Sequence, residues 1–209
     1  MREELDKKLV EKFPKLFRNR YAPMTETCMC WGFSHGDGWF NIINALCSNI
    51  QHHIDWKRGQ RASALRYNRA LARAIREKNI APLLYYYTRK LEDKEPNKWN
   101  IQNAEEALAN EGPFREVPEK VSQVVVDQVK EKFGTLRFYY HGGDEAIDGM
   151  VRMAESMSAC TCENCGVPGT IGGGGWISTL CTSCREKHES RYKDSEEDVF
   201  VVGDDEDEV

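Results

Sequence analysis

The sequence predicts an α+β protein, with a mostly helical body that holds a small antiparallel hairpin or sheet, followed by a cysteine-rich module. Apolar residues recur every three or four positions over several stretches, β-branched and aromatic residues gather in one, and two CxxC pairs lie near the C-terminus. The chain of 209 residues is long enough for one sizeable core and a small appendage. We therefore expect a body over 1–158, a module over 159–193 and an acidic disordered tail over 194–209.

The N-terminal part predicts two helices joined by a tight turn. Residues 3–13 carry apolar side chains on one helical face, and Pro14 ends that pattern. The stretch "TETCMCWGFSHGDGWFNII" follows at 25–43. Beyond it, the apolar residues between Phe40 and Ile54 form a buried stripe, and Asp37 is the expected N-cap of that helix.

A second helix over about 60–78 is expected, with the pair His52-His53 marking the end of the first. It carries four arginines at spacings of three, four and three residues, which places them in one stripe: Arg66, Arg69, Arg73 and Arg76. A solvated helix surface is the favoured interpretation of this stripe. The alternative is a surface for nucleic acid or another acidic partner.

The next stretches predict helices at 82–92 and 103–110 and a strand at 135–140. Residues 121–133 fit either a helix or a strand, and the valine triplet at 124–126 favours a strand and hence a hairpin. Asp144 is a candidate N-cap for a helix over 145–158 that leads to the cysteines.

The strongest chemical signal is a four-cysteine motif made of Cys162, Cys165, Cys181 and Cys184. Two residues between cysteines allow a tight turn to direct both sulfurs at one ion, so the motif predicts a structural zinc site. The glycine-rich stretch between the pairs has the length of a small hairpin, and a helix is expected after the last cysteine. The order of knuckle, hairpin, knuckle and helix is that of a treble-clef zinc finger.

Cys28 and Cys30, with His35 and Asp37, are candidates for a second metal site, a redox pair or a nucleophile with its base. The favoured interpretation is an aromatic-packed turn, since free cysteines are commonly buried. No GxxxxGK[ST], GxGxxG or GxSxG pattern occurs, so no catalytic signature is found. A nuclease of the His-Asn-His type, using His188 and Asn164, is the weaker enzymatic alternative.

Charge and hydropathy bear on partners and location. From Asp194 to Glu208 there are nine acidic residues and no basic one, whereas Trp56–Lys78 holds eight lysines and arginines and one acid. The acidic end repels nucleic acid, whereas the middle has the charge needed to attract it. No apolar run of about 18 residues and no secretory signal occurs, so we expect a soluble cytoplasmic protein without a membrane partner.

Three blocks carry a resemblance: "YAPMTETCMCWGFSHGDGWFNIINALC", "QVKEKFGTLRFYYHGGD" and "CENCGVPGT…GGGGW…LCTSC". Together they resemble a family of small uncharacterised proteins encoded by bacteriophages, prophages and some bacteria. The middle, about 57–118, and the acidic tail fall outside the resemblance. It implies a setting inside an infected or lysogenic bacterial host cell, and it implies no reaction.

These observations favour a non-enzymatic, zinc-stabilised phage-type accessory protein that binds, and inhibits or redirects, a host macromolecule such as a defence or nucleic-acid-processing complex. The alternative is a nucleic-acid-binding accessory protein that uses the arginine stripe and the zinc module.

Overall fold

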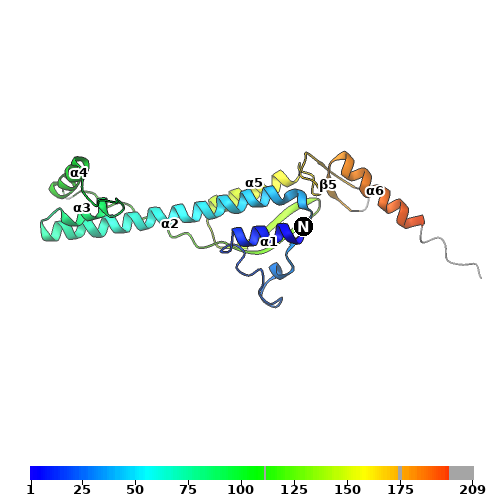
Figure 1. Ribbon diagram of the computed structural model, residues 1–209, viewed down its shortest axis with the longest axis horizontal. Helices are drawn as coiled ribbons and strands as arrows, with labels where there is room; N and C mark the ends of the chain where they lie inside the picture. Colours follow the sequence, from blue (N-terminus) through cyan, green and yellow to red (C-terminus); the bar gives the residue numbers. More distant parts are fainter. Residues whose placement is uncertain (111, 174–175, 198–209) are drawn as a thin grey trace, which may run out of the picture. The chain divides into compact units, whose positions relative to one another are not determined.

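The computed structural model describes residues 1–110, 112–173 and 176–197, and its elements are drawn in Figure 1. The chain divides into two compact units: unit 1 comprises Met1–His52 and the chain from Gln123 onward, and unit 2 comprises His53–Ser122. This division differs from the expected one, because the cysteine module belongs to unit 1 and the middle of the chain forms a unit of its own. Each unit is described separately.

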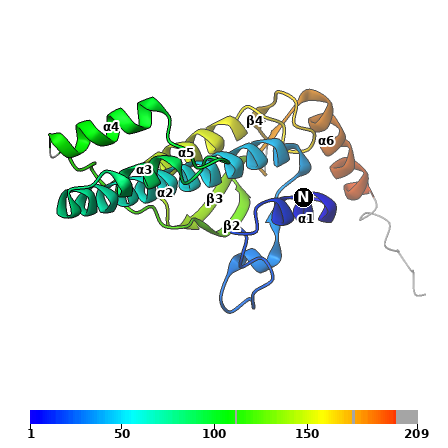
Figure 2. The same cartoon turned by 60° about the vertical axis from the view of Figure 1, so that its left-hand side comes forward.

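Apart from its C-terminal cysteine module, unit 1 is built on three α-helices and a small sheet. The predicted N-terminal helix is α1 (Glu3–Lys12), and α2 (Phe40–Glu77) begins in this unit. Helix α5 (Glu145–Ser158) runs beside the first part of α2, as Figures 1 and 2 show. Asp144 is its N-cap as predicted, since the Asp144 carboxylate accepts a hydrogen bond from the Ile147 backbone N–H.

The sheet confirms the hairpin interpretation of residues 121–133. Strand β2 (Val125–Lys132) pairs antiparallel with β3 (Thr135–His141) and parallel with the short β1 (Phe33–Ser34), in the order β1-β2-β3. Helix α5 satisfies the outer edge of β3: the Leu136 and Phe138 backbone N–H groups donate to Ser158 Oγ and Glu155 Oε1. The edge strand is therefore not left open.

Helix α2 corrects the expectation of two helices separated near His52-His53. It runs without interruption for 38 residues, so the two histidines lie inside it. Its buried positions repeat at helical spacing in two runs, the first with Ile43, Cys47, Ile50 and Ile54 and the second with Ala64, Tyr67, Leu71 and Ala74. Gly59 does not break the helix, because a single glycine in a helix interior costs only about 1 kcal/mol relative to alanine.

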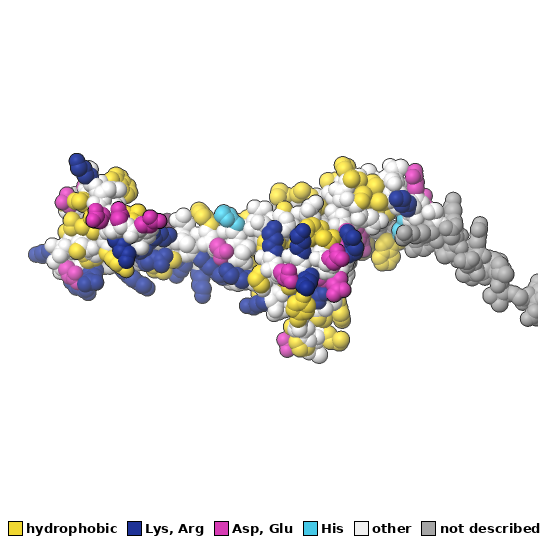
Figure 3. Space-filling view, viewed as in Figure 1, with side chains coloured by type: hydrophobic (Ala, Val, Ile, Leu, Met, Phe, Trp, Pro, Cys, Tyr) yellow, Lys and Arg dark blue, Asp and Glu magenta, His cyan; other side chains and the backbone are white. Residues whose placement is uncertain are grey.

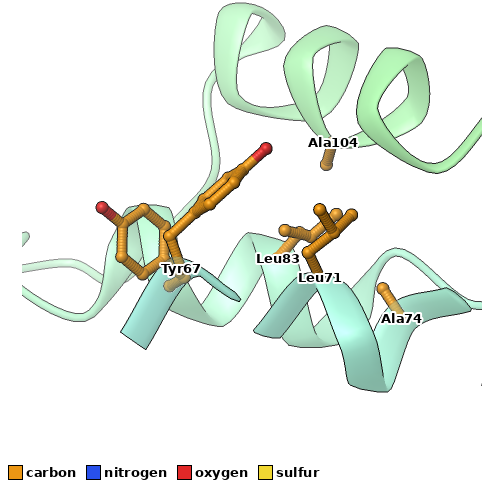
Figure 4. Packing of buried hydrophobic residues seen from close by; sticks show 6 residues of the cluster. Tyr67, Leu71, Ala74, Leu83 and Ala104 are labelled. Atoms are coloured by element: carbon orange, nitrogen blue, oxygen red, sulfur yellow. The ribbon is translucent and has the colours of Figure 1, made fainter. Parts of the chain in front are cut away.

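Unit 2 packs the second part of α2 against α3 (Ala81–Thr88) and α4 (Lys98–Ala109). In Figure 4, Ala104 points from α4 toward Leu71 and Leu83, and all three side chains are fully buried. Compared with the sequence expectation, α3 ends four residues earlier than residue 92. Helix α4 begins earlier than residue 103, because Asn97 caps it by accepting from the Asn100 backbone N–H at 2.9 Å.

In unit 2, an exposed arginine packs on two buried tyrosines. The Arg115 guanidinium lies 3.9 Å from the centre of the Tyr67 ring and donates to Tyr86 Oη at 2.8 Å. Ser63 Oγ lies 2.9 Å from the same phenol oxygen. Burial raises the pKa of Tyr86, but the Ser63 hydrogen bond and the Arg115 charge outweigh that effect and leave it lowered. These contacts join the segment after α4 to α2 and α3.

The C-terminal part of unit 1 contains β4 (Thr170–Gly172), β5 (Ser178–Leu180) and α6 (Thr182–Glu197). Strands β4 and β5 form the predicted hairpin between the two cysteine pairs, and α6 is the predicted helix after them. The expected disordered tail began at residue 194, whereas α6 continues to Glu197. Residues 198–209 of that tail lie outside the described part of the chain. Among the described helices, none has the length and apolar content needed to cross a membrane.

Candidate metal centre

The four cysteines of the two CxxC pairs meet in unit 1. The sulfur atoms of Cys162, Cys165, Cys181 and Cys184 all lie within 4.8 Å of one another, and Cys165 Sγ is 3.7 Å from Cys181 Sγ. Sulfurs bound to one tetrahedral ion at about 2.3 Å would be about 3.8 Å apart. The cluster therefore has the dimensions of a site that can hold a metal ion.

The first pair lies in a turn fixed by its own backbone. The Cys162 N–H donates to Val167 O at 2.8 Å, and the Gly166 N–H donates back to Cys162 O at 2.9 Å. Gly166 has φ +79°, a conformation that residues with a side chain rarely adopt. The turn therefore holds Cys162 and Cys165 on one side of the loop.

The second pair lies at the start of a helix. Cys181 immediately precedes α6, its carbonyl accepts from the Arg185 N–H at 2.9 Å, and Cys184 lies in the first helical turn. The unpaired N–H groups at a helix N-terminus favour negative charge, including thiolates. The Arg185 guanidinium also donates to Thr170 O at 2.7 Å, which joins α6 to β4.

The electrostatics of the cluster favour ionisation at Cys162, whose side chain is fully buried. Burial raises the pKa of this thiol, but backbone N–H groups of Cys181, Cys165 and Asn164 direct hydrogen bonds at its sulfur and lower it to about 7. Burial and the neighbouring thiols raise the pKa of Cys184 to about 12. A cation is needed to hold all four sulfurs as thiolates at neutral pH, because one thiolate disfavours the next.

The first cysteine turn packs on the GDGW part of the N-terminal segment. The Gly38 N–H donates to Glu163 O at 2.6 Å, and the Gly36 N–H donates to Glu163 Oε1 at 2.8 Å. The indole N–H of the fully buried Trp39 donates to Thr161 O at 2.9 Å. We call Gly36–Trp39 the socket, because it receives the cysteine turn.

Both glycines of the socket are required by close backbone approach. A Cβ at Gly38 would lie 2.1 Å from Cys162 O, and one at Gly36 would lie 2.5 Å from Glu163 O. The socket was not predicted from the sequence. The sequence contains one signal for it. Gly36 and Gly38 flank Asp37, and no turn predicted from the sequence requires glycine at these two positions.

The candidate second site at Cys28, Cys30, His35 and Asp37 does not form a group of ligands. Within the described part of the chain, no cluster of three or more histidine, cysteine or carboxylate ligand atoms includes them. Cys28 and Cys30 lie in the turn η1 (Cys28–Trp31), where Cys28 is exposed. The expected packing is therefore wrong for Cys28 and for Trp31, which is 64% exposed, and the buried residue of the turn is Met29.

His35 and Asp37 have structural partners instead. Asp37 lies inside the short helix η2 (Asp37–Trp39) and is not the N-cap of α2, because its carboxylate accepts from the backbone N–H and Nε of Arg2. These bonds lower the pKa of Asp37. His35 is buried between Phe33 and Trp39, and its Nδ1 lies 2.7 Å from Gly36 O.

Two other residues of ligand type near the cysteines, Cys160 and His188, lie outside the cluster. Cys160 is exposed and its thiol donates to Met157 O, and His188 lies on α6 beyond the ligands. The four cysteines therefore form the ligand group without either residue.

The four predicted arginines lie together in unit 2, on the exposed side of the second half of α2. Figure 3 shows basic side chains gathered along this helix. Arg73 and Arg76 are paired with Glu77, at 2.8 Å and 3.6 Å. Arg66, Arg69 and Arg73, with Arg89 of α3, line a pocket of about 410 Å³, whereas Arg76 does not line it.

Comparisons with family models, curated proteins and solved structures find no match to this chain. The arrangement of its own residues therefore carries the functional interpretation.

The socket can be tested with a glycine substitution. Gly38→Ala should destabilise unit 1 by at least about 2 kcal/mol, because the new methyl group forces the cysteine turn off the socket. The measurement is the free energy of unfolding in denaturant with the metal present. Gly149→Ala in α5 is the matched control, since a Cβ there meets nothing within 4 Å. Equal stabilities of the two variants would contradict the socket.

The buried His35 predicts a pH dependence of stability. Burial lowers its pKa in the folded chain from about 6.5 to about 4. Between these values the unfolded chain binds one more proton, so stability is complete above pH 6.5 and falls by about 3 kcal/mol as the pH drops to 4. NMR titration of His35 measures the pKa directly. His35→Asn should lose this part of the pH dependence, and an identical pH profile in the variant would show that other groups cause it.

Proposed function

We propose that the four-cysteine cluster holds a structural Zn²⁺ in a treble-clef-like module, and that the chain is a non-enzymatic, phage-type protein that binds a host macromolecule. The observation that carries the first part is the meeting of four cysteine sulfurs at tetrahedral spacing. Four thiolates are a typical ligand set for structural zinc, and they leave no coordination position open for substrate. Zinc bound there supplies cross-linking between the two cysteine pairs.

The order of elements supports the treble-clef assignment. A cysteine turn comes first, the hairpin β4–β5 follows, and the second pair lies at the N-terminus of α6. In such a module the ion replaces the hydrophobic core that a unit of this size lacks. Here the module also rests on the rest of unit 1, because Thr179 Oγ1 donates to Gly134 O at the β2–β3 turn.

The binding role is supported by the resemblance to phage-encoded proteins and by the charge distribution. The three blocks that carry the resemblance contain the socket, most of the β2–β3 hairpin and both cysteine pairs. The opposed acidic and basic segments provide surfaces for a charged partner. The proposed target is a host defence or nucleic-acid-processing complex in the bacterial cytoplasm, which the protein inhibits or redirects.

The zinc assignment predicts one equivalent of zinc per chain after purification, measured by mass spectrometry of the metal. Cys181→Ser should lose the metal and destabilise unit 1, because structural zinc contributes several kcal/mol to such modules. Cys160→Ser is the matched control, since Cys160 lies next to the site and outside the ligand set. Full zinc content in the Cys181→Ser protein would overturn the assignment.

The binding role predicts that tagged protein isolated from phage-infected bacteria carries a discrete host component, and that the Cys181→Ser protein does not. Deletion of the chain should reduce phage growth on hosts that carry a defence system. The role is contradicted if no component co-purifies and deletion leaves phage growth unchanged.

Nucleic-acid binding is a second candidate, favoured by the accessible arginines of unit 2. Arg66 and Arg69 are exposed and make no ion pair with any described residue. Charge reversal of Arg66, Arg69, Arg73 and Arg76 to glutamate should abolish binding, and the affinity of the unaltered chain should fall steeply with salt. Binding that is independent of salt in the chain without residues 198–209 would exclude this candidate.

A further inference from the structure

The pocket of about 410 Å³ in unit 2 lies between the second half of α2 and α3. Its lining has three chemical parts. Ala70, Ala81 and Pro82 provide small apolar surfaces, Tyr85 and Tyr86 provide aromatic ones, and arginines lie around them. A pocket of this size is within the range that accommodates small organic groups, including a nucleotide base with its sugar.

The basic residues of the pocket differ in how far they are already neutralised. Arg66 and Arg69 have no ionic partner among the described residues, so their charge is available to a ligand. Arg73 is bound to Glu77 at 2.8 Å. Arg89 lies over the Tyr86 ring at 4.2 Å and donates to Tyr86 O, which fixes its position. The pocket therefore has an excess of positive charge with a single carboxylate in it.

Of the two tyrosines in the pocket, one is engaged in the packing of unit 2 and the other is free to contact a ligand. Tyr86 is buried, and its hydroxyl is engaged by Ser63 and Arg115. Tyr85 is 71% exposed although it lines the pocket. Proteins that bind single-stranded nucleic acids commonly combine an exposed aromatic ring with nearby cationic side chains. The cations contact the phosphates, and a base stacks on the ring.

We propose that this pocket binds single-stranded nucleic acid, with the phosphates on Arg66, Arg69 and Arg73 and one base against Tyr85. This inference rests on the second candidate function and adds its ligand class. Arg66 and Arg73 are seven residues apart, which is about 10 Å along the helix axis. That distance is roughly three steps of a stacked strand, so the three arginines can contact phosphates of the same short stretch of one strand.

The pocket favours a single strand over a duplex. In a duplex the bases are paired and stacked inside, and the ring of Tyr85 cannot reach a base face. An unpaired strand exposes its bases, and stacking on an aromatic side chain depends little on the base. An acidic peptide satisfies the arginines but gives no role to Tyr85 or to the apolar floor of the pocket.

The test uses the full chain with its metal and fluorescence anisotropy of labelled oligothymidylate and oligouridylate, each of about 16 nucleotides, with a duplex of the same length. Tyr85→Ala should weaken binding of the single strands between about fivefold and 150-fold and leave duplex binding unchanged. Tyr85→Phe should retain binding, because the ring is kept. Tyr21→Ala, at another exposed tyrosine, is the control.

The arginines are tested within one helix. Arg69→Glu should weaken single-strand binding about tenfold or more, because a charged hydrogen bond is lost and a repulsive charge is gained. Arg76→Glu makes the same charge change on the same helix outside the pocket, so it should weaken single-strand binding much less than Arg69→Glu does. Glu77→Gln should tighten binding, because it releases Arg73 from its ion pair. Unchanged thermal unfolding of each variant shows that the fold is retained.

The outcomes separate the inference from the function on which it rests. Equal losses in Arg69→Glu and Arg76→Glu, with no effect of Tyr85→Ala, overturn the pocket and leave general electrostatic binding of nucleic acid. Absence of binding to every oligonucleotide overturns both. Competition by polyglutamate as effective as competition by oligothymidylate also overturns the inference, and indicates an acidic protein partner. Different affinities for oligothymidylate and oligouridylate decide between DNA and RNA as the source of the strand.

Discussion

The backbone contact between the socket and the first cysteine turn is the constraint on which unit 1 depends. Gly36 and Glu163 are 127 positions apart in the sequence, yet the turn that carries Cys162 is within hydrogen-bonding distance of the socket backbone. Backbones approach this closely only where side chains are missing, and an indole N–H completes the contact. The four cysteines that can hold a metal ion are thus positioned partly by a segment that contributes no cysteine to the cluster, much as outer-shell groups orient the ligands of metal sites.

The sequence predicted the features that are encoded locally. The cysteine spacing, the hairpin between the pairs, the β2–β3 hairpin and the cap at Asp144 all depend on residues close together in the chain. The socket was not predicted, because its glycines are required by contact with the cysteine turn, which lies far away in the sequence. The sequence likewise suggested a cap at Asp37, since an aspartate before an apolar stripe is a common signal. In the structure, the Asp37 carboxylate accepts from the backbone N–H of Arg2, 35 positions away, instead of capping α2.

The two units are stabilised by different chemistry. Unit 1 combines an apolar core with a site suited to a cation, and the pKa of Cys162 reflects backbone groups already directed at its sulfur. Unit 2 contains no cysteine and relies on aromatic rings, Arg115 and buried aliphatic side chains. The sequence did not place the boundary after His52, because the first buried run of α2 extends past it to Ile54. An apolar stripe predicts which face of a helix is buried, but it does not predict which other element packs against that face.

The place where the chain leaves and re-enters unit 1 bears on how local unfolding can be confined. The chain passes into unit 2 after His52 and returns at Gln123, and the side chains of Gln51 and Gln123 are hydrogen-bonded at 3.0 Å. Unit 2 is thus bounded by two points of unit 1 that contact each other. Opening of unit 2 alone leaves these two points joined, so the two units can differ in how readily they open.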